Sequence, residues 1–211
     1  EDADLGRLAS IAAVQEYAPG QGFIEEGAPA EHFFNITEGT ARIFKLLPDG
    51  RRQITGFAGR GDFLGLAVLD NYVFGAEAIE TVRLCRFSRP RMRAVIDDFR
   101  ALEHRLLQTA SNELVAAQEQ MLLLGRKTAR ERVASFLLAR ARSCGQCGEP
   151  ARHLPLPMTR GDIADYLGLT IETISRTLTR LRTEGLIALD GPFRLTIRDL
   201  DGLTAASGVV D

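Results

Sequence analysis

The hydrophobic pattern changes character once along the chain, near Pro90. Before this residue, short apolar stretches alternate with glycines, and after it the apolar residues recur at helical spacing. The strand-like stretches are residues 33–36, 41–44, 53–57 and 82–87. Pro48-Asp49-Gly50 is a turn between two of them, because proline presets φ and glycine accepts a positive φ. Short strands separated by such turns predict a small antiparallel barrel or jelly roll.

A long helix is predicted over residues 100–125, with a small or apolar residue at alternating steps of three and four. This spacing makes a heptad seam whose members are Leu107, Ala110, Leu114, Ala117, Met121 and Leu124. The alternative is a helix that packs on the chain's own barrel. The seam carries no charge and its flanks are polar, which favours pairing with a second copy of the chain.

The C-terminal third of the chain predicts a helix-turn-helix. Thr159 and Asp162 fit a capping box that opens a short helix, which Gly168 ends in a tight turn. Thr170 caps a second helix that runs to about Glu184. A β-hairpin with the turn Asp190-Gly191 follows, over residues 186–197. Two short helices joined by a glycine-containing turn and followed by a hairpin make a winged helix-turn-helix.

The second of these helices has a polar outer face that suits a DNA major groove. Three residues there are placed to contact bases: Glu172, Ser175 and Arg176. Arg176 can give two parallel hydrogen bonds to guanine O6 and N7, and Glu172 can accept one from a cytosine amino group. The residues suited to phosphate oxygens are Arg160, Thr170, Thr173 and Arg180. The alternative is a solvated helix face with an i,i+4 pair between Glu172 and Arg176.

Charge is unevenly distributed along the chain, although the formal net charge is only −2. Residues 1–125 carry a net charge of −5, whereas residues 126–200 carry +5. A basic second part favours contact with a polyanion. We therefore expect an α+β chain with a β-roll sensor domain over residues 1–99, a dimerisation helix over 100–125 and a DNA-binding winged helix-turn-helix domain over 126–211.

The run MTRGDIADYLGLTIETISR, residues 158–176, closely resembles the CRP/FNR superfamily of bacterial transcription regulators, and within it the FNR and FixK branch. The resemblance covers nearly the whole chain. It implies a homodimer on an inverted repeat of the TTGAT…ATCAA type with a four-base-pair spacer, with Glu172, Ser175 and Arg176 contacting bases. It also implies activation of low-oxygen or nitrogen-metabolism genes through contact with RNA polymerase, for which the loop 59–62 is a candidate.

The effector that the resemblance implies depends on a few positions. Relatives that bind cyclic AMP carry a Gly-Glu pair and an Arg-Ser pair, but residues 65–68 and 71–75 contain neither the glutamate nor the arginine. We therefore expect that the chain does not bind cyclic AMP. FNR-type sensors hold a four-iron, four-sulfur cluster with three N-terminal cysteines and one in the barrel. Cys85 resembles the barrel cysteine, and the other three would lie upstream of Glu1. The alternatives are that Cys85 is a buried apolar residue and that the chain, like FixK-type relatives, carries no cluster.

A second pair of cysteines, Cys144 and Cys147, lies in a loop with His153 nearby. Three candidate ligands fall short of the four that a structural zinc site needs, so no metal is predicted with certainty. A loop without chemistry is favoured, and a reversible disulfide is the alternative.

The remaining sequence features indicate where in the cell the protein is found and whether it is an enzyme. No leader and no long apolar run is present, and three cysteines are too few for a disulfide framework, so we expect a cytoplasmic protein that does not enter membranes. An enzyme is not predicted, because the P-loop, the GxSxG elbow and the HExxH motif are all missing from the sequence. A regulator that binds another small molecule in the β-roll is the competing hypothesis.

Overall fold

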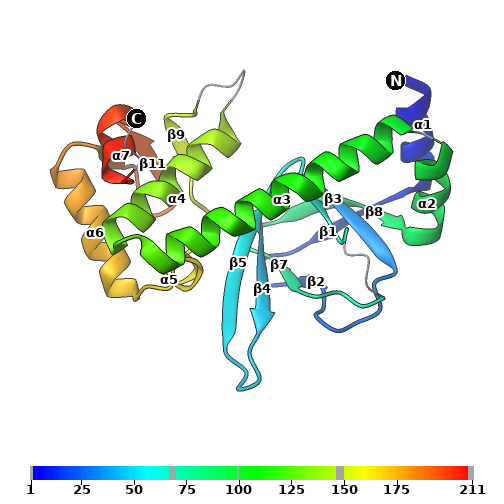
Figure 1. Cartoon of the computed structure of the whole chain (residues 1–211), viewed down its shortest axis with the longest axis horizontal. Helices are drawn as coiled ribbons and strands as arrows, with labels where there is room; N and C mark the ends of the chain where they lie inside the picture. The colour runs from blue at the N-terminus through cyan, green and yellow to red at the C-terminus, as the bar shows by residue number, and fades with distance from the viewer. Residues whose placement is uncertain (1, 67–69, 99, 146–149, 209–211) are drawn as a thin grey trace. The chain divides into compact units, whose positions relative to one another are not determined.

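The computed structural model of the chain describes residues 2–66, 70–98, 100–145 and 150–208. The chain forms two compact units, Glu1–Ala117 and Gln118–Asp211. Figure 1 shows the strands of the first unit, the helices and small sheet of the second, and the long helix α3, whose residues belong to both. The predicted fold class is confirmed, with antiparallel sheets in the N-terminal part, a long helix and a C-terminal helix-turn-helix.

Two four-stranded antiparallel sheets make up the β-roll in the described part of the N-terminal unit. The first sheet has the order β1 (Ala12–Tyr17), β8 (Val82–Ser88), β3 (His32–Glu38) and β6 (Phe63–Leu64). The second has the order β2 (Gly22–Ile24), β7 (Gly75–Ala78), β4 (Ala41–Leu46) and β5 (Arg52–Ala58). The four predicted strand-like stretches lie in β3, β4, β5 and β8, and the turn at Gly50 has the expected positive φ of 82°.

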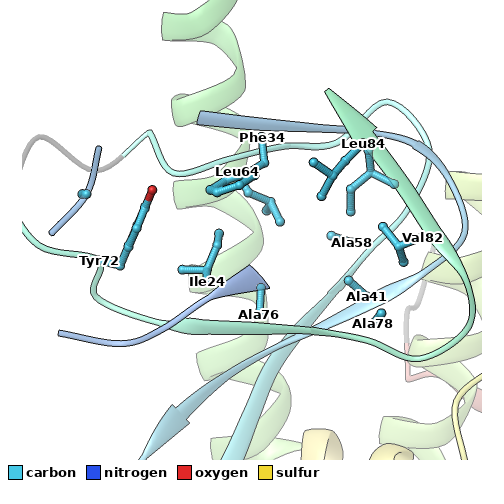
Figure 2. Close-up of a cluster of buried hydrophobic side chains, with 12 residues drawn as sticks. Ile24, Phe34, Ala41, Ala58, Leu64, Tyr72, Ala76, Ala78, Val82 and Leu84 are labelled. Atoms are coloured by element: carbon cyan, nitrogen blue, oxygen red, sulfur yellow. The ribbon is translucent and has the colours of Figure 1, made fainter. Parts of the chain in front are cut away.

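The core of the roll is formed where the inner faces of the two sheets meet (Figure 2). The second sheet contributes four alanines and one large side chain to this core: Ala41, Ala58, Ala76, Ala78 and Ile24. The first sheet contributes large ones: Phe34, Ile36, Leu64, Val82 and Leu84. Mostly small residues on one sheet facing large residues on the other let the two sheets pack closely.

Helices α1 (Asp2–Ile11) and α2 (Arg89–Asp98) contribute to a second apolar cluster of the same unit. Its buried members are Phe33, Phe87 and Met92, and Cys85 of β8 packs against them while remaining partly exposed. The thiol of Cys85 therefore lies among apolar side chains, as expected for a cysteine that serves packing.

The predicted long helix is α3 (Arg100–Arg126). Three large residues of the heptad seam are strongly exposed: Leu107 at 63%, Leu114 at 61% and Met121 at 66%. Ala110 and Ala117 are also exposed, whereas Leu124 is half-buried. A row of exposed leucine and methionine side chains is costly in water, so this face is suited to a partner.

The C-terminal unit is built around α4 (Ala129–Cys144), which follows a capping box between Thr128 and Glu131. Its buried face consists of Val133, Ala134, Phe136, Leu137, Leu138 and Ala141. The other helices are α5 (Arg160–Leu167), α6 (Ile171–Thr183) and α7 (Leu200–Ala206). A three-stranded antiparallel sheet has the order β10 (Ile187–Leu189), β11 (Arg194–Ile197) and β9 (His153–Pro155).

Among the described residues, no helix is both long enough and apolar enough to cross a membrane.

Candidate DNA-binding site

The first helix of the helix-turn-helix, α5, begins and ends as the sequence predicts. The Asp162 amide donates to Thr159 Oγ1 at 3.1 Å, and the Thr159 amide donates to Asp162 Oδ2 at 2.9 Å. This reciprocal pair satisfies two amides that a helix N-terminus otherwise leaves open. Gly168 ends the helix with φ 61° and ψ 43°, a left-handed conformation in which glycine avoids the cost of a Cβ.

The second helix, α6, is also defined by its ends. Thr170 Oγ1 accepts the Thr173 amide at 3.2 Å, and Gly185, with φ +78°, follows the C-cap residue Glu184. The buried face of α6 contains Ile174, Thr177, Leu178 and Leu181. Because these residues fix how the helix is rotated, the opposite face is presented to solvent.

The three candidate base-contacting residues lie together on that face. Glu172, Ser175 and Arg176 are all exposed. Hydrogen bonds from its own backbone amide and from the Thr170 hydroxyl lower the pKa of the Glu172 carboxyl. Within the described residues Glu172 and Arg176 form no ion pair with each other, so the i,i+4 pair of the alternative interpretation is not observed.

The four candidate phosphate contacts differ in their surroundings. Arg160 is half-buried, burial lowers its pKa, and no ion-pair partner lies beside it among the described residues. Arg180 donates through Nε to Glu184 Oε1 at 2.9 Å, and the same carboxylate also pairs with Arg130. Thr170 and Thr173 share a hydroxyl–hydroxyl hydrogen bond of 3.1 Å. Arg160 therefore differs from Arg180, because its guanidinium is partly dehydrated and is not paired with a carboxylate among the described residues.

The hairpin beyond α6 forms, but its connection spans residues 190–193 and includes Phe193, which was predicted to lie in the second strand. Strand β9 extends the hairpin to a third strand that the sequence patterns did not predict. His153, considered above as a metal ligand, lies on β9, where Nδ1 is 3.0 Å from Thr196 Oγ1. Phe193, in the connection between β10 and β11, is 54% exposed and next to the exposed Arg194. Helix α6 and the segment after it carry several exposed arginines: Arg176, Arg180, Arg182, Arg194 and Arg198.

The cysteines do not assemble a metal site in the described part of the chain. No group of three or more potential ligands is found there. A four-iron, four-sulfur cluster needs four thiolates, whereas Cys85 is the single cysteine of the given sequence before residue 118 and packs on apolar side chains. Residues 1–117 of this chain therefore do not fit a cluster by themselves, and the hypothesis of additional cysteines upstream of Glu1 stays untested. Cys144 is half-buried, and Cys147 lies outside the described residues.

One side chain of residues 71–75, the stretch that corresponds to the Arg-Ser pair of cyclic-AMP-binding relatives, belongs to the buried core of the roll. Tyr72 is 7% exposed and points into the core (Figure 2). Its hydroxyl donates to the His32 carbonyl oxygen at 2.8 Å and accepts the His32 amide at 3.0 Å. A buried cation lies nearby, because Arg89 donates to the Gly65 carbonyl oxygen at 3.0 Å and covers the Phe33 ring at 5.1 Å. The guanidinium of Arg89 therefore contacts the protein's own backbone and an aromatic ring.

A capped helix-turn-helix with an arginine-rich outer face and a β-hairpin wing, on a chain that also carries an antiparallel β-roll, defines a DNA-binding regulator. Comparison with known protein families supports this class. Residues 131–206 match the family described as the Crp-like helix-turn-helix domain, and residues 14–99 match the cyclic nucleotide-binding domain.

Individual relatives extend over most of the chain. It is 43% identical to the transcriptional activatory protein AadR of Rhodopseudomonas palustris over 206 residues, which are 97% of this chain and 86% of that protein. It is 42% identical to the nitrogen fixation regulation protein FixK of Bradyrhizobium diazoefficiens over 187 residues, 89% of this chain and 79% of that protein. The solved structure of FixK2 from Bradyrhizobium japonicum matches with a TM-score of 0.88 and 35% identity, covering 95% of this chain and 100% of FixK2.

The chain belongs to the CRP/FNR superfamily of transcription regulators, on its FNR/FixK branch. It is a DNA-binding regulator of transcription rather than an enzyme.

Proposed function

We propose that the chain acts as a homodimer that binds an inverted repeat of the TTGAT…ATCAA type, with a four-base-pair spacer, through Glu172, Ser175 and Arg176. The observation that carries this proposal is the exposed polar face of α6, on a helix whose opposite face is buried and whose N-terminus is capped. A helix held in this way can enter a major groove with its side chains already directed at base edges.

Phosphate contacts would set the register of the protein on the duplex. Arg160, Thr170, Thr173 and Arg180 flank the base-contacting residues in the helix-turn-helix. Arg160 suits this role, because its partly dehydrated guanidinium would gain from an anionic partner. Arg180 would contact a phosphate while its Nε donates to Glu184.

Dimerisation is assigned to the heptad seam of α3. The exposed seam residues Leu107, Leu114 and Met121 follow one another at seven-residue steps, and two further exposed apolar residues, Val115 and Leu122, lie beside them with the same step. A two-fold axis along this face would bury all of them against a second copy. The domain boundaries at residues 99/100 and 125/126 remain predictions.

The biological role that we propose is activation of low-oxygen or nitrogen-metabolism genes in the bacterial cytoplasm. The names of the two relatives, a transcriptional activatory protein and a nitrogen fixation regulation protein, support this role. Activation requires contact with RNA polymerase, for which we propose the loop 59–62. Its backbone is fixed because the Gly59 amide donates to Asp62 Oδ2 at 2.8 Å and the Gly61 amide to the Ile36 carbonyl oxygen at 2.8 Å, while Arg60 is exposed.

Replacing Glu172 with alanine tests the proposed recognition. The carboxylate accepts a hydrogen bond from cytosine in this account, so E172A should lose about tenfold in preference for TTGAT half-sites over half-sites with a changed G·C pair. Because the folded-state pKa of Glu172 lies below its unfolded value, the carboxylate stays ionised and the wild-type preference should hold between about pH 5.5 and 8. Competition binding with the two duplexes measures the preference of E172A and the pH dependence of the wild-type preference. Thr183→Ala, at the far end of α6, is the matched control, and an unchanged preference in E172A would contradict the proposal.

We further propose that cyclic AMP is not the effector, because Tyr72 occupies the interior of the roll and is bonded to the backbone of His32. A ligand present at about 100 times its Kd stabilises a protein by about 2.7 kcal/mol, which raises Tm by several degrees. Thermal melting with millimolar cyclic AMP should therefore give the same Tm as melting with 5′-AMP. A rise of several degrees with the cyclic nucleotide alone would show that the roll is gated by it.

A further inference from the structure

One guanidinium in the C-terminal unit bonds the ends of two helices. Arg132, on α4, donates through Nη2 to the Leu124 carbonyl oxygen at 2.8 Å and through Nε to the Lys127 carbonyl oxygen at 2.9 Å. Leu124 lies in the last turn of α3, and Lys127 directly follows the last residue of that helix, Arg126. The Nη1 of Arg132 donates to the carbonyl oxygen of Leu167, the last residue of α5, at 2.9 Å. A single side chain thus joins the end of the long helix to the first helix of the helix-turn-helix.

A second side chain makes the same connection. Gln120, on α3, donates through Nε2 to the Tyr166 carbonyl oxygen of α5 at 3.0 Å. The turn of the helix-turn-helix comes close as well, since a Cβ added at Gly168 would lie 3.5 Å from both Leu124 Cδ2 and Arg132 Nη1. The end of α3 and the turn between α5 and α6 therefore lie close enough that one added methyl group at Gly168 would bring them into contact.

These bonds complete the hydrogen bonding at the end of α5. A helix leaves its last four carbonyl groups without partners inside the helix. The Ala164 and Asp165 carbonyl oxygens accept the amides of Leu169 and Gly168. The remaining two, of Tyr166 and Leu167, accept Gln120 and Arg132. The positive charge of Arg132 also lies at the negative end of the helix dipole, which strengthens the contact.

We propose that Arg132 and Gln120 are positioning residues that fix the direction of the helix-turn-helix relative to the end of α3, and through it the half-site spacing that the dimer accepts. The inference rests on the proposed dimer and operator. Met121 and Leu124, two residues of the seam, lie on the same turns of α3 that Arg132 and Gln120 hold. A rigid link from the dimer axis to each recognition helix sets the distance and angle between the two recognition helices.

Spacing is the property that such a link controls. Adding two base pairs to the spacer moves one half-site by about 7 Å along the duplex and about 70° around it. A rigid dimer then engages only one half-site, and losing the second costs about 100-fold in affinity. A dimer with a loosened link can follow the displaced half-site and loses less.

The experiment compares the wild-type chain with Arg132→Lys and Gln120→Ala on three duplexes: two half-sites with a four-base-pair spacer, two half-sites with a six-base-pair spacer, and one half-site. Lysine keeps the charge but cannot supply three donors in one plane. We expect the wild type to bind the duplex with the four-base-pair spacer about 100-fold more tightly than the duplex with the six-base-pair spacer. In each variant this preference should fall to about tenfold or less. Binding to the single half-site and the mass of the dimer should be the same in all three proteins. Arg142→Lys, an exposed arginine on α4, is the control and should behave as the wild type.

Two results overturn the positioning role. Either both variants keep the wild-type spacer preference, or they weaken binding to the single half-site as much as to the operator, which is the pattern of a general loss of folding. A wild-type chain that does not distinguish any operator from a scrambled duplex would instead contradict the proposed function, so the two failures are separable.

Discussion

Replacing Arg176 with alanine is expected to abolish the preference of the protein for TTGAT half-sites while leaving its fold intact. Arg176 is exposed on α6 and contributes nothing to the buried face of that helix, so R176A should melt as the wild type does. A bidentate contact with guanine is worth about 1–3 kcal/mol per half-site, and a dimer would lose two of them. Binding measured by fluorescence anisotropy should fall towards the non-specific level.

The design that isolates this contact is a cycle of protein and base changes. The G·C pair of each half-site is replaced in the duplex, and both proteins are titrated with both duplexes. If Arg176 contacts that pair, the base change weakens the wild type strongly and R176A hardly at all. Arg182→Ala, an exposed arginine near the end of the same helix, controls for the loss of charge. Equal sensitivity of wild type and R176A to the base change would remove Arg176 from the base-contacting set.

Leu114→Glu is expected to convert the protein to a monomer and to lower operator affinity by about 10²–10⁴-fold. Leu114 is 61% exposed at the middle of the seam, where a two-fold axis would bring it against its own copy. Two carboxylates facing each other in an apolar seam lose hydration and repel. A monomer binds only one half-site, and the loss of the second accounts for the drop. Analytical ultracentrifugation at about 10 µM and anisotropy with the operator measure the two effects.

Asn112→Glu adds the same charge on α3, two positions from Leu114 and outside the seam, and should leave the dimer intact. A wild-type chain that is already monomeric at micromolar concentration would contradict the dimer directly. An L114E variant that remains dimeric would show that another surface holds the two copies together.

The helix-turn-helix could be predicted from sequence because its ends are specified by local chemistry. Thr159 with Asp162, Gly168 and Thr170 each act within a few residues of their own position, and all of them have the predicted role in the structure. Strands β3, β4, β5 and β8 were predictable for a similar reason, since each contains several apolar or β-branched residues between turns. β9 was not predicted, because a strand of three residues that ends in proline is too short to show a periodicity.

Arg132 and Gln120 could not be identified from sequence patterns. Their acceptors are backbone carbonyl groups, some of them 35 and 46 residues away, and a carbonyl group is the same in every residue. The heptad pattern has a related limit, because periodicity identifies an apolar face but does not say what covers it. Met121 and Leu124 share that pattern, yet Met121 is exposed whereas Leu124 is half-buried close to Gly168.

The most direct test of the central claim is a salt series of binding titrations. The air-exposed chain, without added iron, is titrated against a TTGAT…ATCAA duplex and against a scrambled duplex of equal length. Specific sites are typically bound at least about 10³-fold more tightly than non-specific DNA, and phosphate contacts make both affinities fall as salt rises. We predict this preference for the TTGAT…ATCAA duplex at physiological salt. Equal affinity for the two duplexes at every salt concentration would contradict the account.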